Sequence, residues 1–272
     1  MADYSSIGFG RRLRAALLDI AQSLAAVHFW GFLGWHDIRQ RYRRSTLGPM
    51  WITASTGIMV AAIGMLYSQI LHAEISQYLP YLAIGLVTWG LISTTINESC
   101  MVFIGAEAGI KSNSIPLTAH VLRLVWRNVI VFGHNLVIVA VVLMIFPNKV
   151  GWEIFLVLPA IALVALNGVW MGLFLGVLCT RFRDIPQIVI NVMQVAFYLT
   201  PVIWHPDALK GRHWAVDLNP FYYLLETMRA PIIGGSQQLA HVFGMTALIT
   251  LAGISVTLLF FARFRSRVAY WL

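Results

Sequence analysis

The stretch Asp37–Trp51, DIRQRYRRSTLGPMW, decides the fold because it joins a strongly basic segment to a long apolar one. Four of its residues are arginines, and an uncharged apolar run follows from Met50 to Leu71. Arginines stay in water or among anionic headgroups, whereas an apolar run of this length enters hydrocarbon. The junction therefore predicts the cytoplasmic mouth of a first membrane span.

The whole chain has the composition of a membrane protein. It is 59% hydrophobic and only 11% charged, whereas a soluble domain carries about 25% charge. Several apolar runs of about 20 residues would have no place in a soluble core. The net charge of +8 sits at the ends of apolar segments and forms no basic stripe, which argues against a nucleic-acid partner. We therefore predict an all-α membrane protein.

Six spans are predicted, between a cytoplasmic N-terminal segment over residues 1–49 and a cytoplasmic basic tail over residues 263–272. Of the 19 lysines and arginines, 15 lie in the N-terminal segment, the loops after spans two and four, and the tail. Because positive charge stays in the cytoplasm, both termini are expected on that side. The expected spans are 50–71, 78–97, 128–146, 154–179, 185–204 and 242–262.

Residues 15–35 have two readings, a span or a helix lying in the membrane interface. The segment carries one charge, Asp19, and its aromatic residues gather at one end. A crossing here would place the arginines of 11–14 and those of 39–44 on opposite sides, against the positive-inside bias. We favour an amphipathic helix in the cytoplasmic interface.

Two connections are too long for simple turns. The cytoplasmic one, 98–127, contains EAGIKSNSIP and predicts a short helix outside the membrane. In the outer one, 205–241, Asn219-Pro220 predicts a helix start and Gly234-Gly235 its end. The stretch between them is too short to span and too apolar for water. A re-entrant or lip-lying hairpin on the outer face is expected.

Small and polar residues inside the spans suggest helix contacts. Glycines spaced by four make a smooth face on span four, which we assign to packing within the chain rather than to a homodimer seam: Gly168, Gly172 and Gly176. The polar residues either bond between helices or line a path: His134, Asn135, Asn167, Asn191 and Gln194. No predicted span holds an acidic or basic residue in its interior, and Glu98 lies just past an end. This disfavours a proton- or sodium-coupled transporter.

Aromatic residues in or beside the spans also have two readings. They form an interfacial belt, or they line a channel in which sugar rings stack on aromatic faces. The channel candidates are Trp51, Tyr67, Trp89, Phe197 and Tyr198.

Sequence signatures of covalent chemistry are missing from the chain. It contains no Walker A motif, no Gly-x-Ser-x-Gly and no His-Glu-x-x-His. Two lone cysteines, Cys100 and Cys179, predict neither a disulfide nor a metal site. We expect no catalytic residue, metal or cofactor on this chain, and any ATP to be hydrolysed on another subunit.

Four motifs resemble those of the permease subunits of type-2 ABC exporters for polysaccharides, O-antigen and polyol phosphates. Residues 37–51 are similar to the signature before the first span of that family. RFRDI at 181–185 resembles the motif between spans four and five. LTPVI at 199–203 and LNPF at 218–221 resemble the end of span five and the outer loop. The motifs cover nearly the whole chain in the family's order.

The resemblance implies a homodimer with two copies of an ABC ATPase that binds ATP and Mg²⁺, a lipid-linked glycan as substrate, and the inner membrane as location. It implies coupling to the ATPase through Glu107, Ile110, Lys111, Asn113 and Pro116. Ser112 and Ile115 replace the second lysine and the aromatic residue of the family's coupling pattern. It implies an outer gate at Pro201, Trp204, Asn219, Pro220, Phe221 and Tyr222.

The arginines before the first span, Arg39, Arg41, Arg43 and Arg44, either attract the lipid pyrophosphate or only set the topology. Other functions remain as alternatives for the chain. These are an ABC permease for drugs or small lipophilic molecules, a membrane-embedded glycan-modifying enzyme, and a secondary transporter.

Overall fold

The computed structural model describes residues 8–43, 50–112, 115–147, 151–209, 214–234 and 239–272. Every regular element in these ranges is a helix. The first half contains α1 (Phe9–Ala25), α2 (Val27–Tyr42), α3 (Met50–Ile70), α4 (Ile75–Ser99), η2 (Ile104–Ala106), α5 (Glu107–Ser112) and α6 (Leu117–Ile145). The second half contains η3 (Trp152–Leu156), α7 (Val157–Arg181), α8 (Ile185–Leu199), η4 (Pro206–Leu209), α9 (Trp214–Asp217), α10 (Pro220–Ile233), α11 (Leu239–Phe264), η5 (Arg265–Arg267) and α12 (Val268–Trp271).

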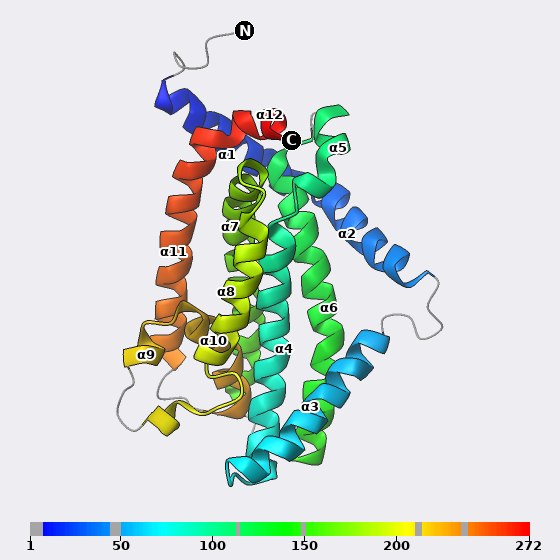
Figure 1. Cartoon of the computed structure of the whole chain (residues 1–272), viewed down its shortest axis with the longest axis vertical. Coiled ribbons are helices and arrows are strands. Elements are labelled where there is room, and N and C mark those ends of the chain that lie inside the picture. The colour runs from blue at the N-terminus through cyan, green and yellow to red at the C-terminus, as the bar shows by residue number, and fades with distance from the viewer. Residues whose placement is uncertain (1–7, 44–49, 113–114, 148–150, 210–213, 235–238) are drawn as a thin grey trace.

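The long helices form a bundle around α4, which is the most buried of them. Figure 1 shows α4, α6, α7 and α11 running along the long axis, with α3 oblique at the lower end. The short helices α5 and α12 lie at the opposite end, where α1 also lies. Within the described ranges, five helices are long and apolar enough to cross a membrane: α3, α4, α6, α7 with η3, and α11. The prediction of an all-α membrane protein is confirmed.

The predicted fifth span, 185–204, is wrong at its end. Helix α8 stops at Leu199 after 15 residues, a length of about 22 Å against the roughly 30 Å of hydrocarbon. Thr200 is extended, with φ −88° and ψ 137°, because a residue before proline is disfavoured in the helical region. The chain therefore leaves the helix at Thr200-Pro201 and turns back toward α4.

Two predicted boundaries also move. Helix α6 begins at Leu117, not at residue 128, because the arginines in its first turns are ion-paired at the end of the bundle and do not interrupt the helix. Residues 263–272 do not form a separate tail. Helix α11 continues to Phe264, and η5 and α12 then fold back so that Val268 is fully buried.

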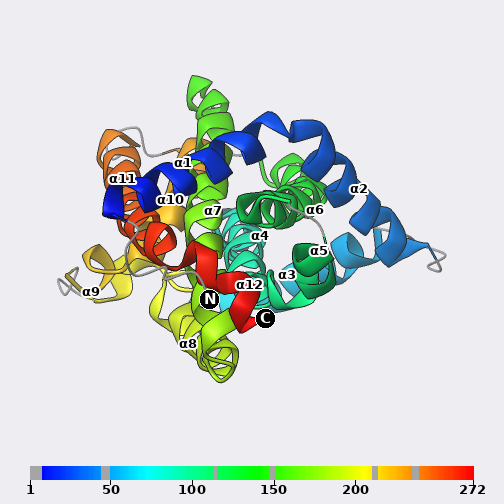
Figure 2. The same ribbon diagram turned by 90° about the horizontal axis from the view of Figure 1, so that it is seen from above.

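The N-terminal segment forms two helices, α1 and α2, which meet at Ala26 with a bend of 66°. Seen from above, α1 lies across the ends of the long helices (Figure 2). Helix α1 packs against α11 and α6, and α2 packs against α6. A helix in the membrane interface would lie crosswise to the spans, as α1 does. Its location in the interface stays a prediction.

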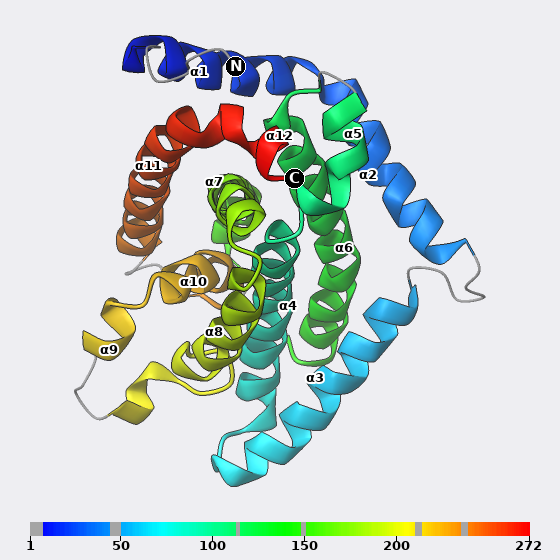
Figure 3. The ribbon, with the colours of Figure 1, turned by 45° about the horizontal axis from the view of Figure 1, so that its top comes forward.

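Asp19 fixes α1 to the bundle. Its carboxylate is fully buried and accepts hydrogen bonds from the backbone N–H groups of Leu117 and Thr118, at 3.1 and 3.0 Å. Arg265 of η5 donates to the same carboxylate through Nε, at 2.8 Å. The first N–H groups of a helix have no partner within it, and a negative charge is favoured there. One side chain of α1 thus caps α6 and pairs with the C-terminal segment; Figure 3 shows these three elements meeting at one end.

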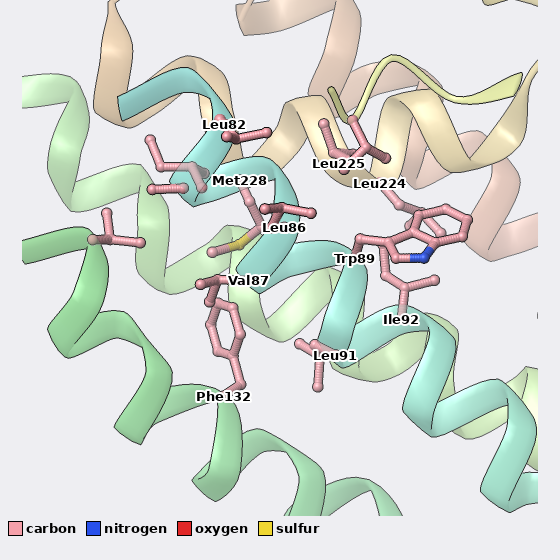
Figure 4. Packing of buried hydrophobic residues seen from close by; sticks show 14 of the residues in the cluster. Leu82, Leu86, Val87, Trp89, Leu91, Ile92, Phe132, Leu224, Leu225 and Met228 are labelled. Atoms are coloured by element: carbon pink, nitrogen blue, oxygen red, sulfur yellow. The ribbon is translucent and has the colours of Figure 1, made fainter. Parts of the chain in front are cut away.

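Helix α10 of the predicted outer hairpin packs inside the bundle, against α4, α7 and α11. Its re-entrant or lip-lying position in the membrane stays a prediction. Asn219 caps α10, because its side-chain oxygen accepts from Phe221 N–H at 3.0 Å, and Pro220 is the first helical residue. Gly234 ends the helix at φ +91°, a conformation that suits glycine. Both helix-end predictions are confirmed; Gly235 lies outside the described residues. Helix α10 reaches the core, where its side chains pack against those of α4 and α6 (Figure 4): Leu82, Leu86, Val87, Trp89, Leu91, Ile92, Phe132, Leu224, Leu225 and Met228.

The three glycines of α7 lie against other helices of the same chain. A Cβ on Gly168 would lie 3.0 Å from Thr95 Cγ2 of α4, and one on Gly172 would lie 2.6 Å from Val121 Cγ1 of α6. A Cβ on Gly176 would lie 2.7 Å from Val102 Cγ1. Their place is therefore the interior of one chain, where they let α7 approach α4 and α6 closely.

We predict that D19N destabilises the protein by about 1–3 kcal/mol, because a capping anion and a partly buried ion pair are lost together. The melting temperature of the detergent-purified protein measures this. The exposed Asp217 provides a control, since D217N should leave the melting temperature unchanged. Equal melting temperatures for D19N and D217N would contradict the structural role of Asp19.

We also predict that G172A costs about 1–3 kcal/mol, because the branched side chain of Val121 is fully buried and has no room to move. Gly133 of α6 has no atom within 4 Å of an added Cβ. G133A should therefore be neutral or stabilising in the same melting experiment. A destabilisation by G133A as large as that by G172A would show that space is not the cause.

Candidate functional site

An aromatic groove lies between α4 and α8. The groove has a volume of about 420 Å³, and a separate neighbouring cavity has a volume of about 640 Å³. The groove is lined by Trp89, Ser93, Asn97, Ile190, Met193, Gln194, Phe197 and Tyr198. The α4 residues recur every four positions and so share one face of that helix. None of the lining residues is charged.

The aromatic rings of the groove touch one another. The ring centroids of Trp89 and Phe197 are 5.7 Å apart, and those of Phe197 and Tyr198 are 5.2 Å apart. Trp89 is mostly buried, whereas 71% of Tyr198 is exposed. Such pairing orients the rings. The ring of Tyr198 stays exposed on the open side of the groove. Three of the five predicted channel residues are brought together here.

The other two predicted channel residues lie on α3 and do not line the groove. Trp51 is exposed at the start of α3, and Tyr67 packs against the main core. The predicted polar residues also divide. Asn135 accepts from Thr53 at 3.3 Å and Asn167 donates to Thr250 at 2.7 Å, so both bond between helices. Gln194 lines the groove.

The residues of the predicted outer gate come together beside the groove. Asn219 donates to Thr200 Oγ1 at 2.9 Å, and Trp204 Nε1 donates to the carbonyl of Tyr198 at 3.0 Å. The ring of Phe221 meets that of Trp89 edge to face at 5.7 Å. The segment after α8 is thereby tied to the start of α10. Of the remaining gate residues, Pro220 begins α10, and Tyr222 packs against Tyr223.

Arg229 of α10 holds the segment after α8 from inside. It is 1% exposed, and it donates through Nη1 to Pro201 O at 3.1 Å and through Nη2 to Val202 O at 3.4 Å. Glu226 pairs with it at 3.3 Å, and its guanidinium carbon lies 3.6 Å from the ring centroid of Tyr81. A buried guanidinium needs such partners, and removing them is costly.

Two tyrosines of α4 complete this cluster. Tyr81 O–H donates to Pro201 O at 3.1 Å, and Tyr78 O–H donates to Ile203 O at 2.9 Å. A Cβ at Gly85 would lie 2.4 Å from Arg229 Nη2, so glycine leaves room for the guanidinium. The non-helical stretch after α8 is thus held by side chains of α4 and α10.

His205 stacks on Tyr81 with ring centroids 3.9 Å apart. Partial desolvation by the surrounding protein and the nearby Arg229 guanidinium lower the pKa of His205 below its usual value, while Asp207 and Glu226 act in the opposite direction. The folded arrangement therefore favours the neutral imidazole.

An ion-pair network closes the opposite end of α4. Arg123 of α6 forms a two-point ion pair with Asp37 of α2, one contact being 2.7 Å. Arg127 pairs with Glu98 of α4, and Asn128 donates to Glu98 Oε2 at 3.0 Å. The four charged residues of this network line the neighbouring cavity together with His120 and Asn97. Asn97 also lines the aromatic groove, so the cavity and the groove are neighbours along α4.

The predicted coupling residues lie on and after α5. Glu107 and Lys111 form an exposed ion pair at 2.7 Å, and the hydrogen bond from Lys111 lowers the pKa of Glu107. Ile110 packs against the same core cluster as Trp271 of α12. Pro116 immediately precedes α6 as its N-cap residue. Asn113 lies outside the described residues.

The predicted headgroup arginines are placed only in part. Arg39 and Arg43 are exposed at the end of α2. Arg41 belongs to α2, and Arg44 lies outside the described residues.

Comparison with known proteins decides the family. The chain matches the ABC-2 type transporter family over residues 29–233, more than half of its length. It belongs to that family.

Two curated relatives are permeases. The chain is 21% identical over 226 residues to the O-antigen export system permease protein RfbA of Klebsiella pneumoniae, covering 81% of this chain and 87% of that protein. It is 24% identical over 230 residues to the protein of the same name from Myxococcus xanthus, covering 83% and 86%. The chain is thus a multi-pass permease subunit of a type-2 ABC exporter, a component of a transport system. Membership of the ABC-2 family implies an ABC ATPase partner.

Sequence reasoning missed the charged partners of this ABC-2 permease. It named Asp19 only as a lone charge and Asp37 only as part of a motif, and it did not single out Arg229. One signal was present for Arg229, since an arginine with a glutamate three residues earlier interrupts the apolar stretch FYYLLETMRAPII. The partners of these charges lie far away along the chain, so spacing does not reveal them.

We predict that the segment 200–206 of the permease loosens as pH falls. Because the folded-state pKa of His205 lies below the ordinary value of about 6.5, the opened segment takes up a proton at a higher pH than the closed one. The stability from the neutral imidazole is present above pH ~6.5 and is lost below it. Hydrogen exchange at pH 7.5 and 5.0, corrected for the intrinsic rate, measures the opening.

The control for this experiment is H205Q, which removes the titrating group. Its exchange in segment 200–206 should show no pH dependence beyond the intrinsic one. If wild type and H205Q loosened equally at pH 5.0, another group would be responsible.

Proposed function

We propose that two copies of this chain form the path by which a lipid-linked, O-antigen-like polysaccharide crosses the inner membrane from the cytoplasm. The energy comes from ATP hydrolysed with Mg²⁺ on two copies of a separate ABC ATPase. The O-antigen export permeases that the chain is similar to support the substrate class.

The aromatic groove between α4 and α8 is the observation that carries this proposal. It combines ring faces with the neutral polar side chains of Ser93, Asn97 and Gln194. A sugar ring has a weakly apolar face and hydroxyls at its edge, so aromatic faces and amides contact it without holding a charge. A lining without charged residues also lets a polymer slide, because no ion pair has to break at each step.

A second copy of the chain would supply the missing wall. Tyr198 of the groove is exposed in one chain, and a hydroxyl-covered polymer has to be shielded from hydrocarbon on all sides. Facing grooves from two copies would enclose it. The exposed apolar residues on the outer faces of α3 and α11 suit contact with lipid.

The ends of the groove suggest how the path opens. At the end where α5 lies, the cavity lined by Asp37, Glu98 and Arg127 adjoins the groove, since Asn97 lines both. Movement of the ATPase against α5 would reach α6 through Pro116 and would disturb these ion pairs. At the other end, the segment after α8 rests on Arg229 and would have to move for the polymer to leave.

The lipid pyrophosphate would enter near the exposed Arg39 and Arg43 at the end of α2. Guanidinium groups pair well with phosphate oxygens, and basic residues beside a span are favoured at an anionic surface. Setting the topology alone remains the simpler role for these arginines.

We predict that W89A/F197A lowers polysaccharide export about tenfold or more, because stacking surfaces worth roughly 1–3 kcal/mol each are removed. The measurement is the amount of polysaccharide at the surface of cells in which this chain is the only such permease, at equal membrane levels of protein. Trp152, which is 86% exposed on η3 and outside the groove, gives the control W152A, whose export should be normal.

Normal export by W89A/F197A would contradict a sugar path along this groove. Transport of lipophilic dyes by the wild type, without any effect of the chain on surface polysaccharide, would favour the drug-permease alternative.

A further inference from the structure

We propose that a basic pocket where α1 crosses the end of α11 binds a phosphate group. The pocket has a volume of about 350 Å³ and lies apart from both the aromatic groove and the ion-pair cavity, with which it shares no lining residue. It is lined by Arg11, Arg12 and Ala15 of α1, Ala262 and Arg263 of α11, and Arg265, Ser266 and Arg267 of η5.

The pocket concentrates positive charge from two distant parts of the sequence. Five of its eight lining residues are arginines, and none is acidic. One of these arginines, Arg265, pairs with the carboxylate of Asp19, whose other hydrogen bonds go to the start of α6. Like charges gathered in one cavity repel each other, so an anion that enters is strongly favoured.

The type of cation selects the type of anion. Guanidinium groups offer planar, paired N–H donors that match phosphate oxygens. Two of the arginines are oriented by aromatic contact, since Arg263 and Arg267 lie 5.7 and 5.9 Å from the ring centroid of Phe264. Ser266 adds a hydroxyl donor to the lining. The volume suits a headgroup but not a polymer.

The position favours a phosphate carried by a lipid over a free one. Helix α11 exposes an apolar stripe that ends directly at Arg263: Leu248, Leu251, Val256 and Leu259. Acyl chains lying along this stripe would bring a phospholipid headgroup to the pocket. Basic pockets at helix ends on the cytoplasmic side of membrane proteins bind anionic headgroups in this way. A bound headgroup would hold α1 against η5 beside the Asp19–Arg265 pair.

The test counts lipids bound to the full-length permease, purified with its ATPase, by native mass spectrometry. The probe is phosphatidylglycerol, with phosphatidylcholine for comparison because its choline offsets the phosphate charge. The pocket variant is R11Q/R263Q, and the matched control is R14Q/R183Q, which removes the same charge from exposed arginines outside the pocket. We expect the pocket variant to bind phosphatidylglycerol about tenfold more weakly than wild type and control.

Two further arms sharpen the result. R11K/R263K keeps the charge but loses the paired donors, so it should weaken binding less than R11Q/R263Q does. If R11Q/R263Q does not fold, R11K/R263K takes its place as the pocket variant. Inorganic pyrophosphate that displaces phosphatidylglycerol at equal concentration would assign the pocket to a soluble phosphate instead of a lipid. Equal loss in R11Q/R263Q and R14Q/R183Q, or no loss in either, would overturn the proposal.

Discussion

Two buried charges, each hydrogen-bonded to backbone groups of another segment, hold the two ends of this bundle. A charge taken out of water is costly unless it is paired and hydrogen-bonded. Asp19 meets that requirement at the N-terminus of α6, and Arg229 meets it with the carbonyls that follow α8. The first contact ties α1 and the C-terminal segment to the bundle. The second fixes where α8 ends and how the outer hairpin enters the core.

These contacts lie at the two ends of the groove that we propose as the transport path. The aromatic groove runs along α4 between the ion pairs of Glu98 at one end and the Arg229 cluster at the other. Polar contacts of this kind have defined geometry and strengthen one another as a network. The permease thus has a buried central helix with a polar cluster at each end, and in the function that we propose these clusters close the path between transport events.

The sequence predicted what depends on length and local chemistry. Apolar runs located α3, α4, α7 and α11 well, and Asn219-Pro220 located the start of α10 because a cap is a contact between near neighbours. It did not predict the end of α8 or the contacts of Asp19. The carboxylate of Asp19 meets Leu117 and Arg265, which lie 98 and 246 positions further along the chain. Such pairings depend on the packing of the whole bundle, and no periodic pattern in the sequence predicts them.

The central claim, that this permease couples ATP hydrolysis on a partner to movement of a lipid-linked polysaccharide, is tested most directly by the ATPase activity of the co-purified complex in lipid. The activity is compared with and without the lipid-linked polysaccharide, for wild type and for K111A on the exposed face of α5. We expect turnover that rises with the polysaccharide and a smaller rise in K111A. An ATPase that does not co-purify, or one whose turnover ignores the polysaccharide, would contradict it.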